Sequence, residues 1–260
     1  KTMKHLLGIE QLTADEIAAL VDHALVLKAG RVRGRIGTEL AGETWAMIFT
    51  KSSTRTRVSF EVGLTELGAR PLFLNANDIQ LGRGEPIRDT ARVLGRMVHG
   101  AIIRTYAQQD VVDFAEYGRI PTINALTDEE HPCQILADLL TIRERLGGWE
   151  GKKIVFFGDG DCNMGRSWAW AAKRLGFELV VAAPKAFQPD DAFMARLGEA
   201  PVTLTEEVES AARGADVLYT DTWVSMGREA EAEERLKILA PYQINQSLVD
   251  LANPGAIVQH

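Results

Sequence analysis

Four consecutive side chains that can bind an anion stand in front of a helix-period stretch in the first quarter of the sequence. They are Ser53, Thr54, Arg55 and Thr56, and a strand-like run ends just before them. Backbone N–H groups at a helix start have no partners within the helix and carry partial positive charge, so they attract phosphate. Hydroxyl and guanidinium groups add further donors. A plain Ser or Thr helix cap is the alternative, but four such residues in a row favour a phosphate site.

Two more polar residues, Arg104 and His131, stand at the ends of predicted elements. Arg104 follows a predicted strand, 101–103, and His131 precedes Pro132 at the start of a long helix-period segment. Taken alone, Arg104 is better explained as a member of a surface ion pair and His131 as a helix cap. Gln134 follows on the same helix start, which brings an amide beside the imidazole. Because open α/β sheets bind ligands at the carboxyl ends of their strands, these side chains predict one polar site.

A second group of polar residues follows predicted strands in the C-terminal half. Asp221 comes after a strand, and Ser225 and Met226 stand just beyond it. Asn163 comes shortly after another strand, 154–157. An ordinary turn is the simple explanation of the Ser225 segment when it is taken alone. Its place after a strand makes it a candidate binding loop.

A dinucleotide-dependent oxidoreductase is the strongest alternative from another enzyme class, because Gly158-Asp159-Gly160 follows a strand. The third glycine of that fingerprint would fall at position 163, which is Asn163. The next strand, 179–182, is followed by no acidic residue that could bind a ribose. No Gly-x-x-x-x-Gly-Lys run precedes Ser53 either. Both nucleotide-binding patterns therefore fail.

Strand-length apolar runs alternate with helix-period segments along the whole chain, which predicts parallel βαβ units. The sequence favours an α/β fold of two Rossmann-like parallel-sheet domains joined by a linking helix, with the active site in the interdomain cleft. The predicted limits are 1–131, 132–147 for the linking helix, and 148–260. The predicted strands are 45–49, 72–74, 101–103, 122–124, 154–157, 179–182, 216–219 and 256–258. The predicted helices are 56–67, 87–98 with Gly100 ending it, 132–146, and one that contains residues 164–175.

Composition narrows the class of protein. The chain has 260 residues, 46% of them hydrophobic and 25% charged, and a formal net charge of −7. An acidic chain does not suit nucleic acid, no apolar run is long enough to cross a membrane, and two cysteines imply no disulfide framework. We therefore expect a cytoplasmic enzyme. Because a strand-like run, 256–258, stands at the last residues, we also expect further C-terminal residues in the complete protein.

The run from Phe49 to Arg57, then Arg104, then the run from His131 to Asp138 resemble the carbamoyl-phosphate half of the aspartate/ornithine carbamoyltransferase family. The resemblance covers essentially the whole chain. It implies that the hydroxyl run, Ser53 to Thr56, binds the phosphate. The same resemblance implies that Arg104 and His131 polarise the carbamoyl carbonyl, and that Gln134 binds the carbamoyl amino group. No cofactor and no metal are implied.

In the second half, the segment from Asp221 to Gly227 resembles the ornithine-binding loop of the family's ornithine-specific members. The resemblance puts Asp221 on the α-amino group and Ser225 and Met226 near the ornithine backbone. Asn163 resembles the residue that holds the α-carboxylate, but the run that contains it is one residue longer than usual. Whether Asn163 or a neighbour meets the carboxylate therefore stays open.

Gln80 resembles a loop residue that reaches the phosphate in a neighbouring subunit, so the resemblance also implies a homotrimer or a multiple of trimers. The activity that it implies is carbamoyl transfer from carbamoyl phosphate to the δ-amino group of L-ornithine, giving L-citrulline and phosphate in arginine biosynthesis. A different amine acceptor and a non-catalytic, carbamoyltransferase-like binding protein are the alternatives.

Overall fold

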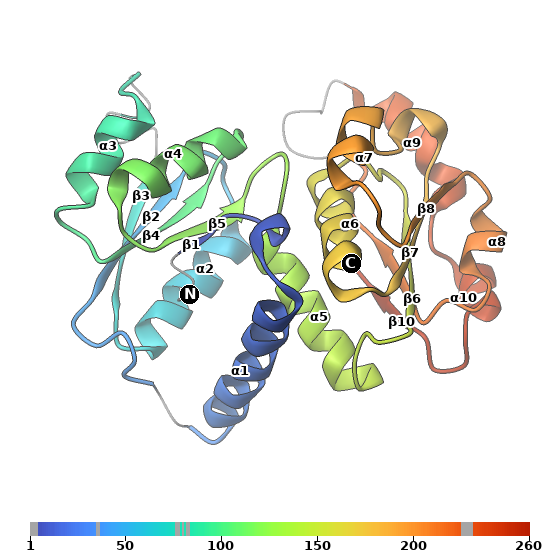
Figure 1. Cartoon of the computed structure of the whole chain (residues 1–260), viewed down its shortest axis with the longest axis horizontal. Helices are drawn as coiled ribbons and strands as arrows, with labels where there is room; N and C mark the ends of the chain where they lie inside the picture. The colour runs from blue at the N-terminus through green and yellow to red at the C-terminus, as the bar shows by residue number, and fades with distance from the viewer. Residues whose placement is uncertain (1–4, 35–36, 76–78, 80, 82–83, 225–230) are drawn as a thin grey trace. The chain divides into compact units, whose positions relative to one another are not determined.

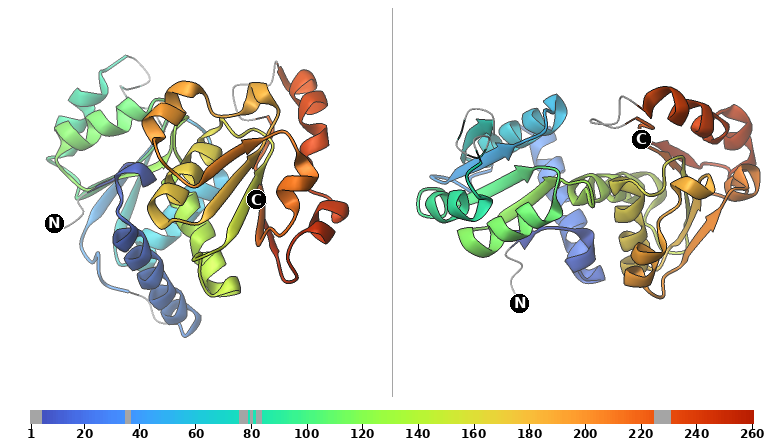
Figure 2. Two further views of the ribbon diagram at one scale, coloured as in Figure 1. Left: turned by 45° about the vertical axis from the view of Figure 1, so that its right-hand side comes forward. Right: turned by 90° about the horizontal axis from the view of Figure 1, so that it is seen from above.

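The computed structural model describes residues 5–34, 37–75, 79, 81, 84–224 and 231–260 (Figure 1). The chain forms two compact units, Lys1–Leu136 and Ala137–His260, and the boundary falls inside one helix, α5 (Pro132–Leu146). Each unit contains a parallel sheet with helices on both of its faces, as the two views of Figure 2 also show. The predicted α/β fold class is confirmed. The predicted domain limits at 131 and 147 stay a prediction.

In the described part of the first unit, five parallel strands form a sheet in the order β1-β5-β4-β2-β3. These strands are β1 (His5–Leu6), β2 (Thr44–Phe49), β3 (Arg70–Asn75), β4 (Gly100–Arg104) and β5 (Thr122–Leu126). The helical segments that accompany them are η1 (Ile9–Gln11), α1 (Ala14–Val32), α2 (Thr54–Glu66), α3 (Ile87–Leu94) and α4 (Gln108–Gly118).

Alternation along the central strands gives the first unit two apolar layers, because successive side chains of a strand point to opposite faces. Ala46 and Ile48 of β2 pack with Ala91 of α3 and Phe114 of α4 on one face. The opposite face of β2 packs against α2. The members of that second layer include Trp45, Met47, Phe49, Leu64, Ala69, Ile102 and Ala125.

The second unit repeats this plan among its described residues, with a five-stranded parallel sheet in the order β10-β9-β6-β7-β8. Its strands are β6 (Lys153–Phe157), β7 (Glu178–Ala182), β8 (Val202–Thr205), β9 (Val217–Thr220) and β10 (Ile257–Gln259). Its other helical segments are α6 (Asn163–Leu175), η4 (Lys185–Phe187), α7 (Asp191–Leu197), α8 (Val208–Ala212), α9 (Ala232–Leu239), η6 (Ala240–Tyr242) and α10 (Gln246–Leu251).

Aromatic side chains fill one face of the second sheet. Trp168 of α6 is fully buried and makes an edge contact with Tyr219 of β9, their ring centroids 5.2 Å apart. Phe156 of β6 stacks on the same tyrosine at 5.6 Å. The other face of the sheet packs against α8 and α10. This aromatic layer packs against both β6 and β9.

In each sheet the strand order reverses between two central strands. In the first sheet β2 lies between β3 and β4, and Phe49 pairs with Arg104 at the ends of β2 and β4. In the second sheet β6 lies between β7 and β9, and Phe157 pairs with Thr220. Open α/β sheets bind ligands outside the carboxyl ends of strands at such switch points. The topology alone therefore selects the residues that follow these four strands.

One predicted helix is shorter than the sequence suggested. The apolar spacing extended it to Val98, but α3 ends at Leu94 and the chain turns at Gly95. A Cβ at Gly95 would lie 2.2 Å from the carbonyl oxygen of Gly118, so α3 and α4 approach too closely here for any side chain. Gly100, predicted to end that helix, instead begins β4, where a Cβ would lie 2.6 Å from the Trp45 ring. Val98 is still buried, which explains why it matched the helical spacing.

Among the described residues no helix is long and apolar enough to cross a membrane.

Candidate active site

At the first switch point, the start of α2 and the end of β4 are joined by hydrogen bonds. Ser53 caps α2: its Oγ accepts from the backbone N–H of Thr56 at 3.3 Å and donates to Thr56 Oγ1 at 2.9 Å. Arg104 Nη1 donates to the same Thr56 hydroxyl at 3.3 Å. Thr54 and Arg55 are exposed and form the first turn of α2. The predicted phosphate run thus lies at a helix N-terminus, with its hydroxyls beside Arg104.

Arg104 is buried, and its side chain is only partly paired. The residue is 7% exposed, and within the described parts of the chain its Nε has no hydrogen-bond partner. No carboxylate among those residues forms an ion pair with it, and burial lowers the pKa of the guanidinium from its ordinary value. A buried cation without an anion is unfavourable unless a ligand completes its hydrogen bonds. Arg104 therefore suits an anionic or strongly polar ligand.

His131 stands immediately before α5 and interacts electrostatically with Arg104. Burial, with a further contribution from the Arg104 charge, lowers the pKa of the imidazole to about 3. A neutral imidazole has one N–H donor and one acceptor nitrogen. Gln134, in the first turn of α5, is half-buried. The structure thus brings Ser53, Thr56 and Arg104 into direct contact, with His131 within reach of the Arg104 charge, whereas Gln80 lies outside the described residues.

Lys51 was not predicted as a site residue. Its ammonium pairs with Asp128 and lies 4.1 Å from the centroid of the Tyr106 ring. The residue is 8% exposed although it belongs to the loop between β2 and α2. A lysine directly before a hydroxyl run was the available signal, but only the fold brings Asp128 and Tyr106 to it.

At the second switch point, acidic residues follow both central strands. Asp159 comes after β6 and Asp221 after β9. The Asp221 carboxylate accepts from the backbone N–H of Thr222 at 2.8 Å, and no Lys or Arg of the described residues forms an ion pair with it. Burial raises its pKa, and the charge of Asp159 raises it further, while the charge of His260 lowers it. A carboxylate in this setting suits a cationic group such as an amine.

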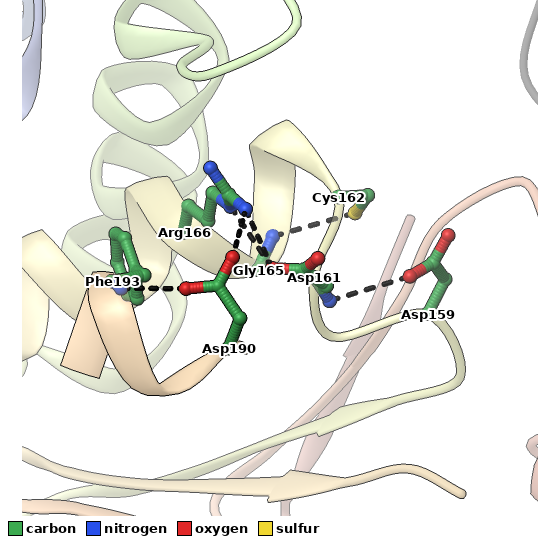
Figure 3. Close-up of polar contacts among 7 residues, drawn as sticks. All are labelled: Asp159, Asp161, Cys162, Gly165, Arg166, Asp190 and Phe193. Carbon is green, nitrogen blue, oxygen red and sulfur yellow. Dashed lines mark hydrogen bonds and ion pairs between the residues drawn. The ribbon is translucent and has the colours of Figure 1, made fainter. Parts of the chain in front are cut away.

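The loop after β6 contains a small polar cluster, drawn in Figure 3. Arg166 of α6 donates to Asp161 at 2.8 Å and contacts Asp190 at 3.5 Å. Cys162 caps α6, its sulfur accepting from the backbone N–H of Gly165 at 3.5 Å. Asn163 is therefore the first residue of α6. Asp161 and Cys162 thus precede the helix, and Asn163 stands at its start.

Arg235 of α9 was missed by the sequence interpretation. It is 6% exposed, its guanidinium pairs with Asp159, and its Nε donates to the carbonyl oxygen of Trp223 at 2.7 Å. No local signal marks an arginine that acts through contacts to two distant loops. Ser225 and Met226 lie outside the described residues.

No group of three or more His, Cys, Asp or Glu within the described ranges could hold a metal ion. The donors at the first switch point are instead hydroxyl, guanidinium and backbone N–H groups, which suit oxyanions.

Known proteins match both halves. Residues 4–144 match the carbamoyl-P binding domain of aspartate/ornithine carbamoyltransferases, and residues 150–260 match their Asp/Orn binding domain. The chain belongs to the aspartate/ornithine carbamoyltransferase family. The resemblance stated from the sequence motifs is thus confirmed.

Within this carbamoyltransferase family, an ornithine carbamoyltransferase from Akkermansia muciniphila is 58% identical over 99% of this chain and 85% of that protein. One from Methanothermobacter thermautotrophicus is 49% identical over 99% of this chain and 85% of its own length. Among solved structures, the ornithine carbamoyltransferase from Pyrococcus furiosus has a TM-score of 0.90 and 45% identity, covering 98% of this chain and 83% of that one.

Proposed function

We propose that this carbamoyltransferase transfers the carbamoyl group of carbamoyl phosphate to the δ-amino group of L-ornithine, giving L-citrulline and phosphate. The observation that carries the proposal is a contrast of charge. Within the part of the chain that the structure describes, the buried Arg104 lacks an anionic partner at one switch point, and the carboxylate of Asp221 lacks a Lys or Arg partner at the other. Arg104 suits the anionic carbamoyl phosphate, and Asp221 suits an amino group. The names of the similar proteins support ornithine as the acceptor.

The first switch point binds carbamoyl phosphate in this proposal. The backbone and hydroxyls of Ser53 and Thr56, with Thr54 and Arg55 of the first turn of α2, bind the phosphate oxygens. Arg104 and neutral His131 donate to the carbonyl oxygen, and Gln134 orients the carbamoyl amino group. The hydrogen bond between Arg104 and Thr56 supports this division, because it fixes the guanidinium beside the phosphate subsite.

The second switch point binds ornithine. Asp221 pairs with the α-amino group, while Asn163 or a neighbouring residue meets the α-carboxylate. Ser225 and Met226 are proposed to contact the ornithine backbone on the strength of the sequence resemblance.

Chemistry proceeds without a protein nucleophile. The neutral δ-amine attacks the carbonyl carbon, and negative charge develops on the carbonyl oxygen, where Arg104 and His131 stabilise it. The C–O bond to phosphate then breaks, phosphate leaves with its electron pair, and the attacking nitrogen loses a proton. Positioning of the two substrates supplies the rest of the rate enhancement. Because an aliphatic amine has a pKa of roughly 10.4, activity should rise toward alkaline pH.

The test is product formation with two acceptors in parallel. The purified protein, given carbamoyl phosphate with L-ornithine or with L-aspartate, should form citrulline and no carbamoyl aspartate. Carbamoyl aspartate as the main product would identify a different acceptor. No product from either amine would favour the alternative of a non-catalytic binding protein.

The assembly proposed for this chain is a homotrimer, or a multiple of trimers, with Gln80 contributing to the site of a neighbouring subunit. If the site is shared, mixing inactive Gln80→Ala and Arg104→Ala proteins should restore part of the activity, because some sites then receive both intact residues. Mixtures as inactive as their components would argue against sharing. A cytoplasmic location and a role in arginine biosynthesis go with this proposal.

A further inference from the structure

Arg235 is a buried arginine of α9 that contacts the segments after both central strands of the second sheet. Its side chain is 7% exposed and that of its partner, Asp159, is 16% exposed. Asp159 follows β6, whereas Trp223, whose carbonyl accepts from Arg235 Nε at 2.7 Å, follows β9. The guanidinium also lies 4.8 Å from the Phe187 ring centroid, with Glu231 at 3.8 Å. One side chain thus joins the two loops that form the switch point.

The same two loops also touch through Trp223. Gly158 has φ +115°, and a Cβ there would lie 2.9 Å from the indole Nε1 of Trp223. The indole of Trp223 therefore packs directly against the backbone of Gly158, the residue before Asp159. Because Arg235 holds the carbonyl of Trp223 and glycine leaves room for its ring, the course of the chain from Asp221 to Trp223 is fixed at both sides.

The charge of Arg235 has a second consequence. The charges of Asp159 and His260 act on Asp221, and the charge of Asp221 in turn acts on Tyr219 and Cys162. Burial raises the pKa of Tyr219 and of Cys162 further above their ordinary values, so both side chains are neutral near pH 7. Among these residues, Asp159 is the one that carries the same negative charge as Asp221 and raises its pKa. Its ion pair with Arg235 opposes the repulsion that two neighbouring carboxylates would otherwise exert.

We infer that Arg235 is a positioning residue for the acceptor amino acid: it holds the loop of Asp221 through Trp223 and neutralises Asp159, so that Asp221 is placed and charged to receive an amino group. This inference rests on the proposed function, because it takes Asp221 as the group that binds the acceptor. The guanidinium need not touch either substrate.

The experiment measures inhibition by L-norvaline, which keeps the α-amino and α-carboxylate groups of ornithine and lacks the δ-amine. The inhibition constant of norvaline is measured between roughly pH 5 and pH 7, so that titration of the δ-amine of the competing ornithine does not interfere. The variants are Arg235→Met, Arg235→Lys and Asp159→Asn. Lys237→Met is the matched control, because Lys237 is an exposed cation of the same helix and pairs with Glu233 of that helix.

The expected results differ in sign. Arg235→Met should weaken norvaline binding about 10- to 100-fold, the usual loss for a hydrogen bond to a charged group. It should also raise the pH below which norvaline binding is lost. Asp159→Asn, which removes the like charge and keeps the cation, should move that loss to lower pH. Arg235→Lys should keep the pH profile and still bind more weakly, because it lacks Nε. The KM of carbamoyl phosphate should not change in any of them.

Profiles indistinguishable from Lys237→Met, or a shift in the same direction for Arg235→Met and Asp159→Asn, would overturn the inference. So would equal losses for both substrates, which indicate a general structural role. If Arg235→Met does not fold, the contrast between Arg235→Lys and Asp159→Asn still decides. An unaltered protein that forms no citrulline defeats the proposed function instead, which keeps the two failures apart.

Discussion

The two units of this protein have the same sheet topology at their switch points, and the side chains that stand there carry opposite charge. The segment after β2 presents hydroxyls and Arg55, and β4 ends at the buried Arg104. After β6 and β9 it presents Asp159 and Asp221. A parallel sheet thus supplies a place for a ligand, and the residues at the strand ends decide which ligand it is.

The units also differ in how they treat a buried arginine. Arg104 has no carboxylate partner within the described chain, whereas Arg235 pairs with Asp159. An arginine of the first kind keeps its charge for a ligand, and one of the second kind fixes other residues in place. Burial alone therefore does not identify a catalytic arginine; its partner does.

Among the substitutions that test this contrast, the largest effect is expected at Arg104. Arg104→Ala should lower kcat by about 10²- to 10³-fold, as loss of an oxyanion donor does. Initial rates of citrulline formation measure it, and Arg96→Ala serves as the control, since Arg96 is an exposed arginine of the same unit. Unchanged turnover would remove Arg104 from the mechanism.

A smaller effect is expected at Gly158, whose backbone conformation and lack of a side chain set the Trp223 loop. Gly158→Ala combines a positive φ with a Cβ 2.9 Å from Trp223, so it should lower the free energy of unfolding by on the order of 3 kcal/mol and raise the KM of ornithine. Gly176→Ala is the control, because Gly176 has φ +76° and no atom within 4 Å of its Cβ position. It should lose only about 1–2 kcal/mol and leave the KM unchanged. Equal losses would contradict the close contact.

The smallest effect concerns His131, whose pKa is lowered first by burial and then by the charge of Arg104. Its pKa is lowered from 6.5 to about 3 in the fold, so the unfolded chain binds the proton first as the pH falls. This contribution to the free energy of unfolding is complete above pH 6.5 and is lost as the pH falls toward 3. At pH 5 the loss is at most about 2 kcal/mol. Urea unfolding at two pH values should show a smaller loss in His131→Gln than in the unaltered protein. The exposed His23→Gln variant is the control; a loss as large in His131→Gln would exclude a depressed pKa.

Much of the first site could be predicted from the sequence, because its residues are local. Ser53 to Thr56 form one helix start, and Arg104 ends a strand with a clear apolar run. Asp221 and Asn163 also lie at the predicted ends of elements, Asp221 one residue beyond β9 and Asn163 at the start of α6.

What the sequence could not predict depends on contacts between distant residues. Arg235 and Asp159 are 76 positions apart, and Lys51 and Asp128 are 77 apart, so neither ion pair has a local signal. β1 has only two residues, too few to show alternation, and it was missed. The end of α3 was misplaced because Gly95 is dictated by the approach of α4, which spacing cannot reveal.

The contrast between the units is tested most directly by crossing one variant from each site with both substrates. Arg55→Ala should raise the KM of carbamoyl phosphate and leave that of ornithine near its original value. Asp221→Asn should raise the KM of ornithine by about 10- to 100-fold and leave that of carbamoyl phosphate unchanged. If both variants instead raise both KM values equally, the two switch points do not bind separate substrates and the account is wrong.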